Sequence, residues 1–464
     1  MKPQLSLLTL CLLLGACGST AQRPDSGIQP PSSWQSPHTQ NATHRNLQWW
    51  TQFGSPELDR LIEQARVGSY DLAAAIARVR QAQADTVIAG GSLLPEVKAG
   101  LNANRQKLLR GSGYSQLDAD SSNKAVDYFD ANLSATYEID FWGGQRASRD
   151  SAQFGLQASE FDQATVELTL LSGVANSYAQ ALSLREQSRI AGLNLANAQN
   201  VLNLVQTRFD SGSATALELA QQKSLVAAQQ RQLPLVQQQA QDALISLAAL
   251  LGRPVQQLRL GAERFEQLSW PTIAAGVPSE LLTRRPDIAR AEAQLAAAQA
   301  DVTVARAAML PAVTLSAELG SGADRAADIL RNPFYNLTAG LLAPVFNNGR
   351  LSAERDKATA RQEELLENYR GAIINGFADV EKALNGIRGL DEQRQWQVEE
   401  LNQAQTAFNI AQSRYEAGAE DLLTVLETQR TLYAAQDLNV QLRLSRLQAS
   451  IALYKALGGG WQAL

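Results

Sequence analysis

The chain contains two copies of one sequence pattern, and this internal repeat limits the folds that it can adopt. A segment of 31 residues from Asp71 aligns with a segment from Asp287, at a shift of 216 positions, and twelve positions are identical. Shorter matches follow in the same order at a shift of 206 positions, RFDSGSA from Arg208 with RYEAGAE, and ALLG with KALG. Each half therefore predicts the same order of elements: helix, two strands, long helix, break and long helix.

Four segments alternate between apolar and polar residues, which is typical of strands with one apolar and one polar face. The clearest, FDANLSATYEI, alternates without a break from Phe129 to Ile139. The predicted strands cover residues of about 95–106, 127–141, 311–320 and 334–345. Strands of about ten residues can span a bilayer when tilted; a soluble sheet packed on helices is the alternative. Small residues on the apolar faces favour the membrane.

Four strands are too few to close a barrel, and lipid does not tolerate open sheet edges. If the strands are transmembrane, several chains must therefore share one barrel. Two chains would give eight strands and three would give twelve. Side chains would fill an eight-stranded barrel, whereas a larger barrel leaves room for water.

Two long segments without proline predict long helices. They run from Arg146 to about Phe209 and from Arg350 to about Tyr415, and each would be about 95 Å long at 1.5 Å per residue. Apolar residues recur every seven positions after Phe161, which indicates a seam with a partner helix. Shorter helices, over residues of about 215–251 and 421–457, return along the long ones.

The breaks between these helices contain glycine at two matching positions, Gly212 and Gly418. A glycine there can end a helix in the left-handed conformation. Thr215 and Asp421 are candidate N-caps for the returning helices. Each half therefore predicts a helical hairpin with a tight turn at its tip.

The N-terminus has the features of a signal peptide over residues 1–16, because Lys2 is followed by an apolar core and by LGAC, which ends at Cys17. This ending resembles the lipobox of bacterial lipoproteins; an ordinary signal peptide with a chance cysteine is the alternative. Residues 17–46 predict a tether rich in Pro and Ser. The remaining chain divides into a first repeat at 47–252, a linker at 253–280 and a second repeat at 281–464.

The composition excludes several classes of function. The net charge of −5 argues against a nucleic acid partner, which needs basic patches. Both histidines, His38 and His44, lie in the predicted tether, so the repeats offer no histidine for a metal or for acid–base chemistry. The sequence also has no Gly-rich phosphate loop. We therefore expect neither an enzyme nor a metal site.

Together these motifs, with APVFNNGR from Ala343 and YKALGGGW ending at Trp461, resemble the outer membrane factor (TolC-like) family. The match is closest to the acylated drug-efflux branch typified by OprM. The resemblance implies a mainly α fold with a β-barrel part. In such a fold, long helical hairpins form a periplasmic tunnel, and a homotrimer with four transmembrane strands per chain closes a 12-stranded barrel in the bacterial outer membrane.

The resemblance also implies a function, that of a passive exit duct for drugs or other small toxic molecules. An inner-membrane pump of the RND type would drive export through a periplasmic adaptor. Cys17 would carry an N-acyl chain and an S-diacylglycerol, with no other cofactor. Four residues match the tips that dock the adaptor: Arg208, Gly212, Arg414 and Gly418.

By the same resemblance, acids near the tips line the gate of the tunnel. Glu218 and Glu427 are the expected gate residues, and rings of carboxylates attract cations. Thr424 stands where some members carry a further acid, which lowers the expected cation selectivity.

Three other functions fit parts of the sequence. The exit duct of a type I protein secretion system would have the same fold. An envelope enzyme would need a catalytic cluster that we do not find. A lipid-anchored coiled-coil spacer would have the helices but no need for four amphipathic strands.

Overall fold

The computed structural model describes residues 25–36, 48–107, 125–271 and 273–461. The chain forms two compact units, and each takes segments from both repeats. The first unit includes Arg80–Ala158 and Ala291–Tyr369, and the second includes Ile28–Val79, Ser159–Arg290 and Arg370–Leu464. The compact units therefore cut across the repeats.

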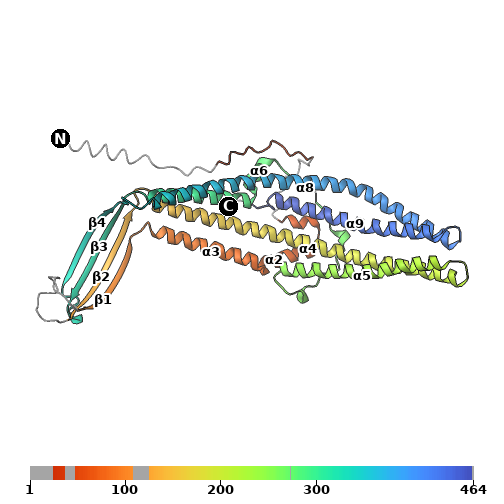
Figure 1. Ribbon diagram of the computed structural model, residues 1–464, viewed down its shortest axis with the longest axis horizontal. Coiled ribbons are helices and arrows are strands. Elements are labelled where there is room, and N and C mark those ends of the chain that lie inside the picture. The colour runs from red at the N-terminus through yellow and green to blue at the C-terminus, as the bar shows by residue number, and fades with distance from the viewer. Residues whose placement is uncertain (1–24, 37–47, 108–124, 272, 462–464) are drawn as a thin grey trace. The chain divides into compact units, whose positions relative to one another are not determined.

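The first unit contains one antiparallel sheet with the strand order β1-β2-β3-β4 (Figure 1). The strands are β1 (Glu96–Gln106), β2 (Val126–Ile139), β3 (Ala312–Ala323) and β4 (Pro333–Leu342). The four predicted strands are confirmed. Each repeat contributes one hairpin, and β2 pairs with β3 to join them.

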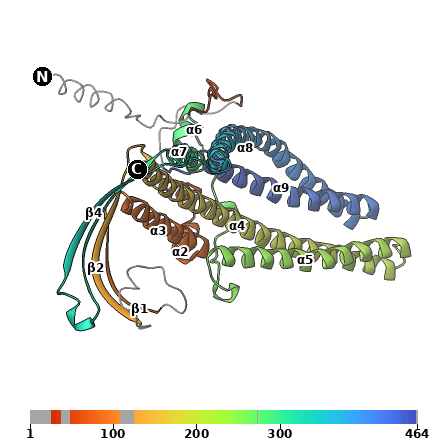
Figure 2. The same ribbon diagram turned by 60° about the vertical axis from the view of Figure 1, so that its left-hand side comes forward.

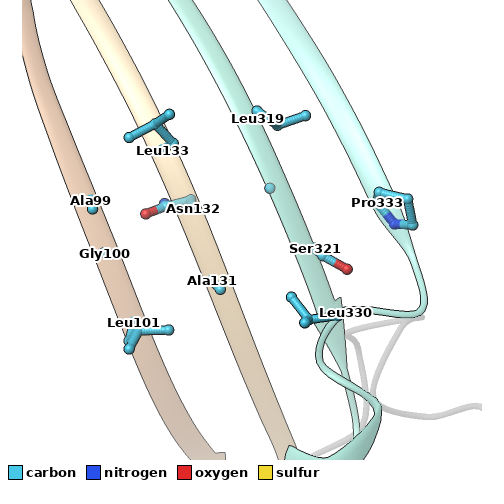
Figure 3. A pocket seen from close by; sticks show the side chains of 11 residues that line it. Ala99, Gly100, Leu101, Ala131, Asn132, Leu133, Leu319, Ser321, Leu330 and Pro333 are labelled. Atoms are coloured by element: carbon cyan, nitrogen blue, oxygen red, sulfur yellow. The ribbon is translucent and has the colours of Figure 1, made fainter.

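One face of this sheet is apolar and strongly exposed in the single chain. Leu133 on β2 lies opposite Ala99 on β1 and Leu319 on β3, as the unbroken alternation predicts. Leu101 is 81% exposed and Leu337 is 73% exposed. A groove on this sheet has a volume of about 550 Å³, and Figure 3 shows leucines beside the small residues that line it. A face of this kind requires an apolar environment.

The strand ends differ from the prediction at β3, which continues to Ala323 instead of stopping near residue 320. Gly320 and Gly322 do not break the strand, because aromatic rings cover them: a Cβ on Gly320 would lie 2.6 Å from the ring of Phe334, and one on Gly322 would meet Tyr128. The three residues after Gly320 are therefore a correction to the predicted strand end.

Two other strands are shorter than predicted at their C-terminal ends. β2 stops at Ile139 instead of residue 141, because the carboxylate of Asp140 accepts hydrogen bonds from the backbone N–H groups of Gln145 and Arg146, both at 3.0 Å, at the start of α4. β4 stops at Leu342 instead of residue 345. Pro344 follows, and proline has no N–H for the ladder.

Long helices make up most of the chain, and the two repeats give the same lengths. Helices α4 (Gly144–Asp210) and α8 (Arg350–Glu416) have 67 residues each, and α5 (Ala216–Leu250) and α9 (Leu422–Ala456) have 35 each. The shorter helices are α2 (Pro56–Gly68), α3 (Tyr70–Gly91), α6 (Pro278–Arg284) and α7 (Pro286–Ala307). Among the described helices, none is both long and apolar enough to cross a membrane.

The returning helices are tied to the long ones through buried glutamine side chains. Figures 1 and 2 show α5 beside the C-terminal half of α4, and α9 beside that of α8. The amide of Gln222 on α5 donates to the carbonyl of Ala198 on α4 at 2.8 Å, and that of Gln397 on α8 donates to Ala435 on α9 at 2.8 Å. Such bonds compensate for burying a polar amide.

The repeated ALLG and KALG motifs close each half in the same way. Gly252 and Gly458 have φ of 66° and 90°, a left-handed conformation that glycine adopts without strain. A Cβ at Gly252 would collide with the carbonyl of Gly68, where α2 ends, and a Cβ at Gly458 would collide with that of Arg284, where α6 ends. The motif therefore marks a close backbone contact.

The predicted tether at 17–46 is only partly described, and its described part is not a free linker. Trp34 is 5% exposed and belongs to an apolar core with residues of α6, α8 and α9. The segment was predicted as a tether because proline and serine residues precede Trp34, and a single tryptophan does not make a periodic pattern.

We expect Gly458→Ala to lower the stability of the protein. The left-handed conformation costs an alanine about 1–2 kcal/mol, and the collision with the Arg284 carbonyl adds to this cost. The matched control is Gly389→Ala in α8, where a Cβ meets nothing within 4 Å. Thermal unfolding followed by circular dichroism should show a lower Tm for the first variant and an equal or higher Tm for the second. Equal Tm values for both variants would contradict the close-contact reading.

Candidate functional site at the helix turns

The turn from α4 to α5 contains two of the predicted docking residues. Gly212 has φ of 73°, and its N–H donates to the carbonyl of Phe209 at 2.9 Å. The N–H of Ser213 donates to the carbonyl of Arg208 at 2.7 Å. These are the two bonds of a Schellman motif, in which a left-handed residue ends the helix.

The turn from α8 to α9 repeats this geometry. Gly418 has φ of 76°, its N–H donates to Tyr415 at 3.0 Å, and the N–H of Ala419 donates to Arg414 at 2.8 Å. The four docking residues predicted from the sequence thus occupy matching positions in two turns of the same backbone type.

Different side chains cap the helices that follow. Thr215 and Glu218 form a capping box at the start of α5, with Glu218 accepting from the Thr215 N–H at 2.6 Å. Asp421 caps α9 by accepting from the N–H of Thr424 at 2.9 Å. This hydrogen bond holds the pKa of Asp421 below its ordinary value. Because that pKa is lowered on folding, the cap is fully present above pH 4 and is lost only as the pH falls through the lower folded value.

Arg208 connects the two hairpins, whereas Arg414 does not. The guanidinium of Arg208, on α4, donates to the carbonyl of Tyr415, on α8, at 2.6 Å and lies 4.5 Å from the centre of the Tyr415 ring. Burial raises the pKa of the Tyr415 hydroxyl, and the charge of Arg208 opposes that shift. Arg414 instead contacts Glu420 at 3.3 Å and the carbonyl of Ala419 within its own turn.

The predicted gate residues have unequal surroundings. The Glu218 side chain is half-buried and engaged in the capping box. The Thr424 hydroxyl is 3.0 Å from Asp421. Glu427 is exposed in the second turn of α9. Of the two acids predicted to line the gate, Glu427 is therefore the more exposed.

The sequence analysis did not single out two leucines that lie exposed near the turns. Leu217 is 66% exposed and Leu423 is 53% exposed. They are related by the shift of 206 positions that relates the two turns, and each lies in the first turn of its returning helix. The sequence signal that could have identified them is a leucine at the same position after the turn in both repeats.

The polar face of the sheet is a second candidate site. Asn102 donates to Asp130 at 2.9 Å, and Asn132 donates to Glu318 at 3.1 Å. These bonds orient the carboxylates across β1, β2 and β3. The described residues contain no group of three His, Cys, Asp or Glu side chains arranged for a metal. Cys17, the predicted lipidation site, lies outside the described residues.

Comparisons with known proteins agree along almost the whole chain. The profile of the family described as outer membrane efflux protein matches residues 61–253 and 277–459. The pyoverdine export outer membrane protein OpmQ of Pseudomonas aeruginosa is 65% identical over 99% of this chain and 97% of its own length. OpmQ of Pseudomonas putida is 63% identical over 99% and 98%.

Solved structures give the same result at lower identity. The outer-membrane channel OprN superimposes with a TM-score of 0.86, at 26% identity over 96% of this chain and 100% of that chain. The outer membrane channel MtrE of Neisseria gonorrhoeae, solved in an open state, gives a TM-score of 0.84 at 25% identity, over 95% and 97%.

We expect Arg208→Ala to loosen the tie between the two hairpin ends, because it removes the hydrogen bond to Tyr415 and the contact with its ring. A nitroxide attached at Ala214→Cys should become more mobile in electron paramagnetic resonance spectra. Arg414→Ala is the control, since its partners lie in its own turn. Equal mobility in the two variants would reject the connecting role of Arg208.

Proposed function

Because this chain belongs to the outer membrane efflux protein family, and two relatives above 60% identity are named as pyoverdine exporters, we propose that it is the outer-membrane exit duct for pyoverdine. An efflux duct in the outer membrane that extends into the periplasm follows from the family itself. The cargo is the proposal, and it replaces the general expectation of drugs or small toxic molecules.

The gap in identity supports this cargo. A toluene efflux pump protein, TtgF of Pseudomonas putida, is 29% identical, and a cation efflux protein, CusC of Escherichia coli, is 28% identical. Relatives at that distance thus differ in named cargo, whereas the two above 60% share one. Near-complete coverage of both excludes a match confined to one module.

A homotrimer provides strand partners for the two open edges of the sheet. Three copies of the four-stranded sheet supply twelve strands, which pair the outer edges of β1 and β4 and leave a water-filled lumen. The apolar face with Leu101 and Leu337 then meets lipid, and the polar face with Asp130 and Glu318 meets water.

The proposed partners supply the energy and the connection that a passive duct needs. It acts as a passive duct without catalysis, anchored by acyl chains on Cys17. An RND-type pump in the inner membrane supplies the energy, and a periplasmic adaptor docks on the turns around Gly212 and Gly418. The exposed Leu217 and Leu423 supply apolar contact area for the adaptor.

The cargo is tested in Pseudomonas aeruginosa that lacks its own OpmQ. Expression of this chain should restore pyoverdine in the medium and lower it in the periplasm. Tolerance to toluene, measured in the same cells, reports on another cargo. Restored toluene tolerance without pyoverdine export would overturn the proposed cargo but keep the duct.

We expect Leu217→Ser with Leu423→Ser to weaken adaptor docking without loss of stability, because both side chains are exposed. Gly212→Val should weaken docking by straining the turn. A photo-crosslinker at Ala214→Cys, followed by mass spectrometry, measures the adaptor captured in cells. Leu193→Ser is the control, since Leu193 is 52% exposed on α4 and away from the turns. Undiminished capture by the double variant would exclude these leucines from the interface.

We expect Glu427→Gln to lower the cation preference of the reconstituted channel, and Glu218→Gln to lower it less, because the capping box already engages that carboxylate. The zero-current potential across a bilayer with a salt gradient measures the preference. Glu392→Gln, exposed on α8, is the control. A double variant with the wild-type potential would reject the gate assignment.

A further inference from the structure

The N-terminal segment from Ile28 to Ser36 ends in a specific contact inside the second compact unit. The indole N–H of Trp34 donates to the carbonyl of Gly276 at 2.9 Å. Its ring meets that of Phe377 edge to face, with centres 6.3 Å apart. An indole needs both an apolar site and a partner for its N–H, and this site supplies both.

The main chain after the tryptophan is held as well. The carboxylate of Glu381, one turn beyond Phe377 on α8, accepts from the backbone N–H of Gln35 at 2.6 Å and from that of Ser36 at 3.3 Å. A carboxylate that accepts consecutive backbone N–H groups fixes the direction of a chain without reading its side chains. The surface therefore binds a tryptophan together with the two backbone N–H groups that follow it.

The surface itself comes from distant parts of the sequence. Trp34 packs in one core with Ala275 of the linker between the repeats, Leu281 of α6, Val380 of α8 and Leu453 of α9. These elements belong to the linker and the second repeat, whereas Trp34 precedes the first. The segment is thus the piece from the start of the chain that completes this core.

We propose that Ile28–Ser36 is a docking strap and that the surface around Phe377, Gly276 and Glu381 is its dedicated receptor. The predicted tether reached residue 46, whereas the contact of Trp34 anchors the chain at residue 34. A chain of 17 residues, from Cys17 to Trp34, spans at most about 60 Å, whereas one of 29 residues spans about 100 Å. The strap therefore limits how far Cys17, and acyl chains where they are attached, can lie from Trp34.

The strap is tested with a nitroxide on Ser32→Cys in the full-length chain, with Cys11→Ser and Cys17→Ser, so that the label has a single thiol to react with. The label should be immobilised in this parent chain and mobile in Trp34→Ala. Glu381→Gln should mobilise it partly, because an amide oxygen still accepts one N–H. The dock does not depend on acylation, so its failure is distinct from a failure of lipidation or of the proposed duct.

Two matched controls separate docking from general damage. Trp396→Ala removes a tryptophan that is 73% exposed on the same helix, and Glu392→Gln removes an exposed carboxylate there; both should leave the label immobilised. If Trp34→Ala does not fold, as judged by circular dichroism, Glu381→Gln decides. A mobile label in the parent chain, or one still immobilised in both dock variants, would overturn the proposal.

Discussion

The edges of the four-stranded sheet are the constraint on which the rest of the structure depends. In the described part of the chain, strands β1 and β4 each pair on one side only. A backbone N–H or C=O left unpaired in hydrocarbon costs several kcal/mol. The apolar face requires contact with lipid, and the open edges of β1 and β4 require strands from neighbouring subunits. Oligomerisation is thus a requirement of the backbone, and the helices must be compatible with it.

Most of the fold could be predicted because its signals are periodic and occur twice. Alternation over β2 predicted its faces, and the glycines of the two turns predicted the hairpin ends to within one residue of Asp210 and Glu416. The failures have local causes. The end of β3 was hidden because Gly320 reads as a loop residue until Phe334 is placed over it, which only the strand register reveals.

The candidate site was predicted in position but not in contacts. The repeat predicted equivalent roles for Arg208 and Arg414, and the backbone of the two turns is equivalent. However, the guanidinium of Arg208 contacts Tyr415 on the other hairpin, whereas that of Arg414 contacts residues of its own turn. Likewise Glu218 was predicted only as a gate acid, although a Thr three residues before it is the signature of a capping box. Side-chain partners depend on the neighbouring helix, which a repeat alone does not specify.

The exposed apolar face and the open edges also govern how the protein must be made. A newly exported chain presents an unpaired β edge and leucines in water, the surface that promotes aggregation. Its survival then depends on the rate at which it meets lipid and other subunits, so folding becomes concentration-dependent. For this chain, handling in the laboratory calls for detergent from the first step, and overexpression faster than membrane delivery would yield insoluble material.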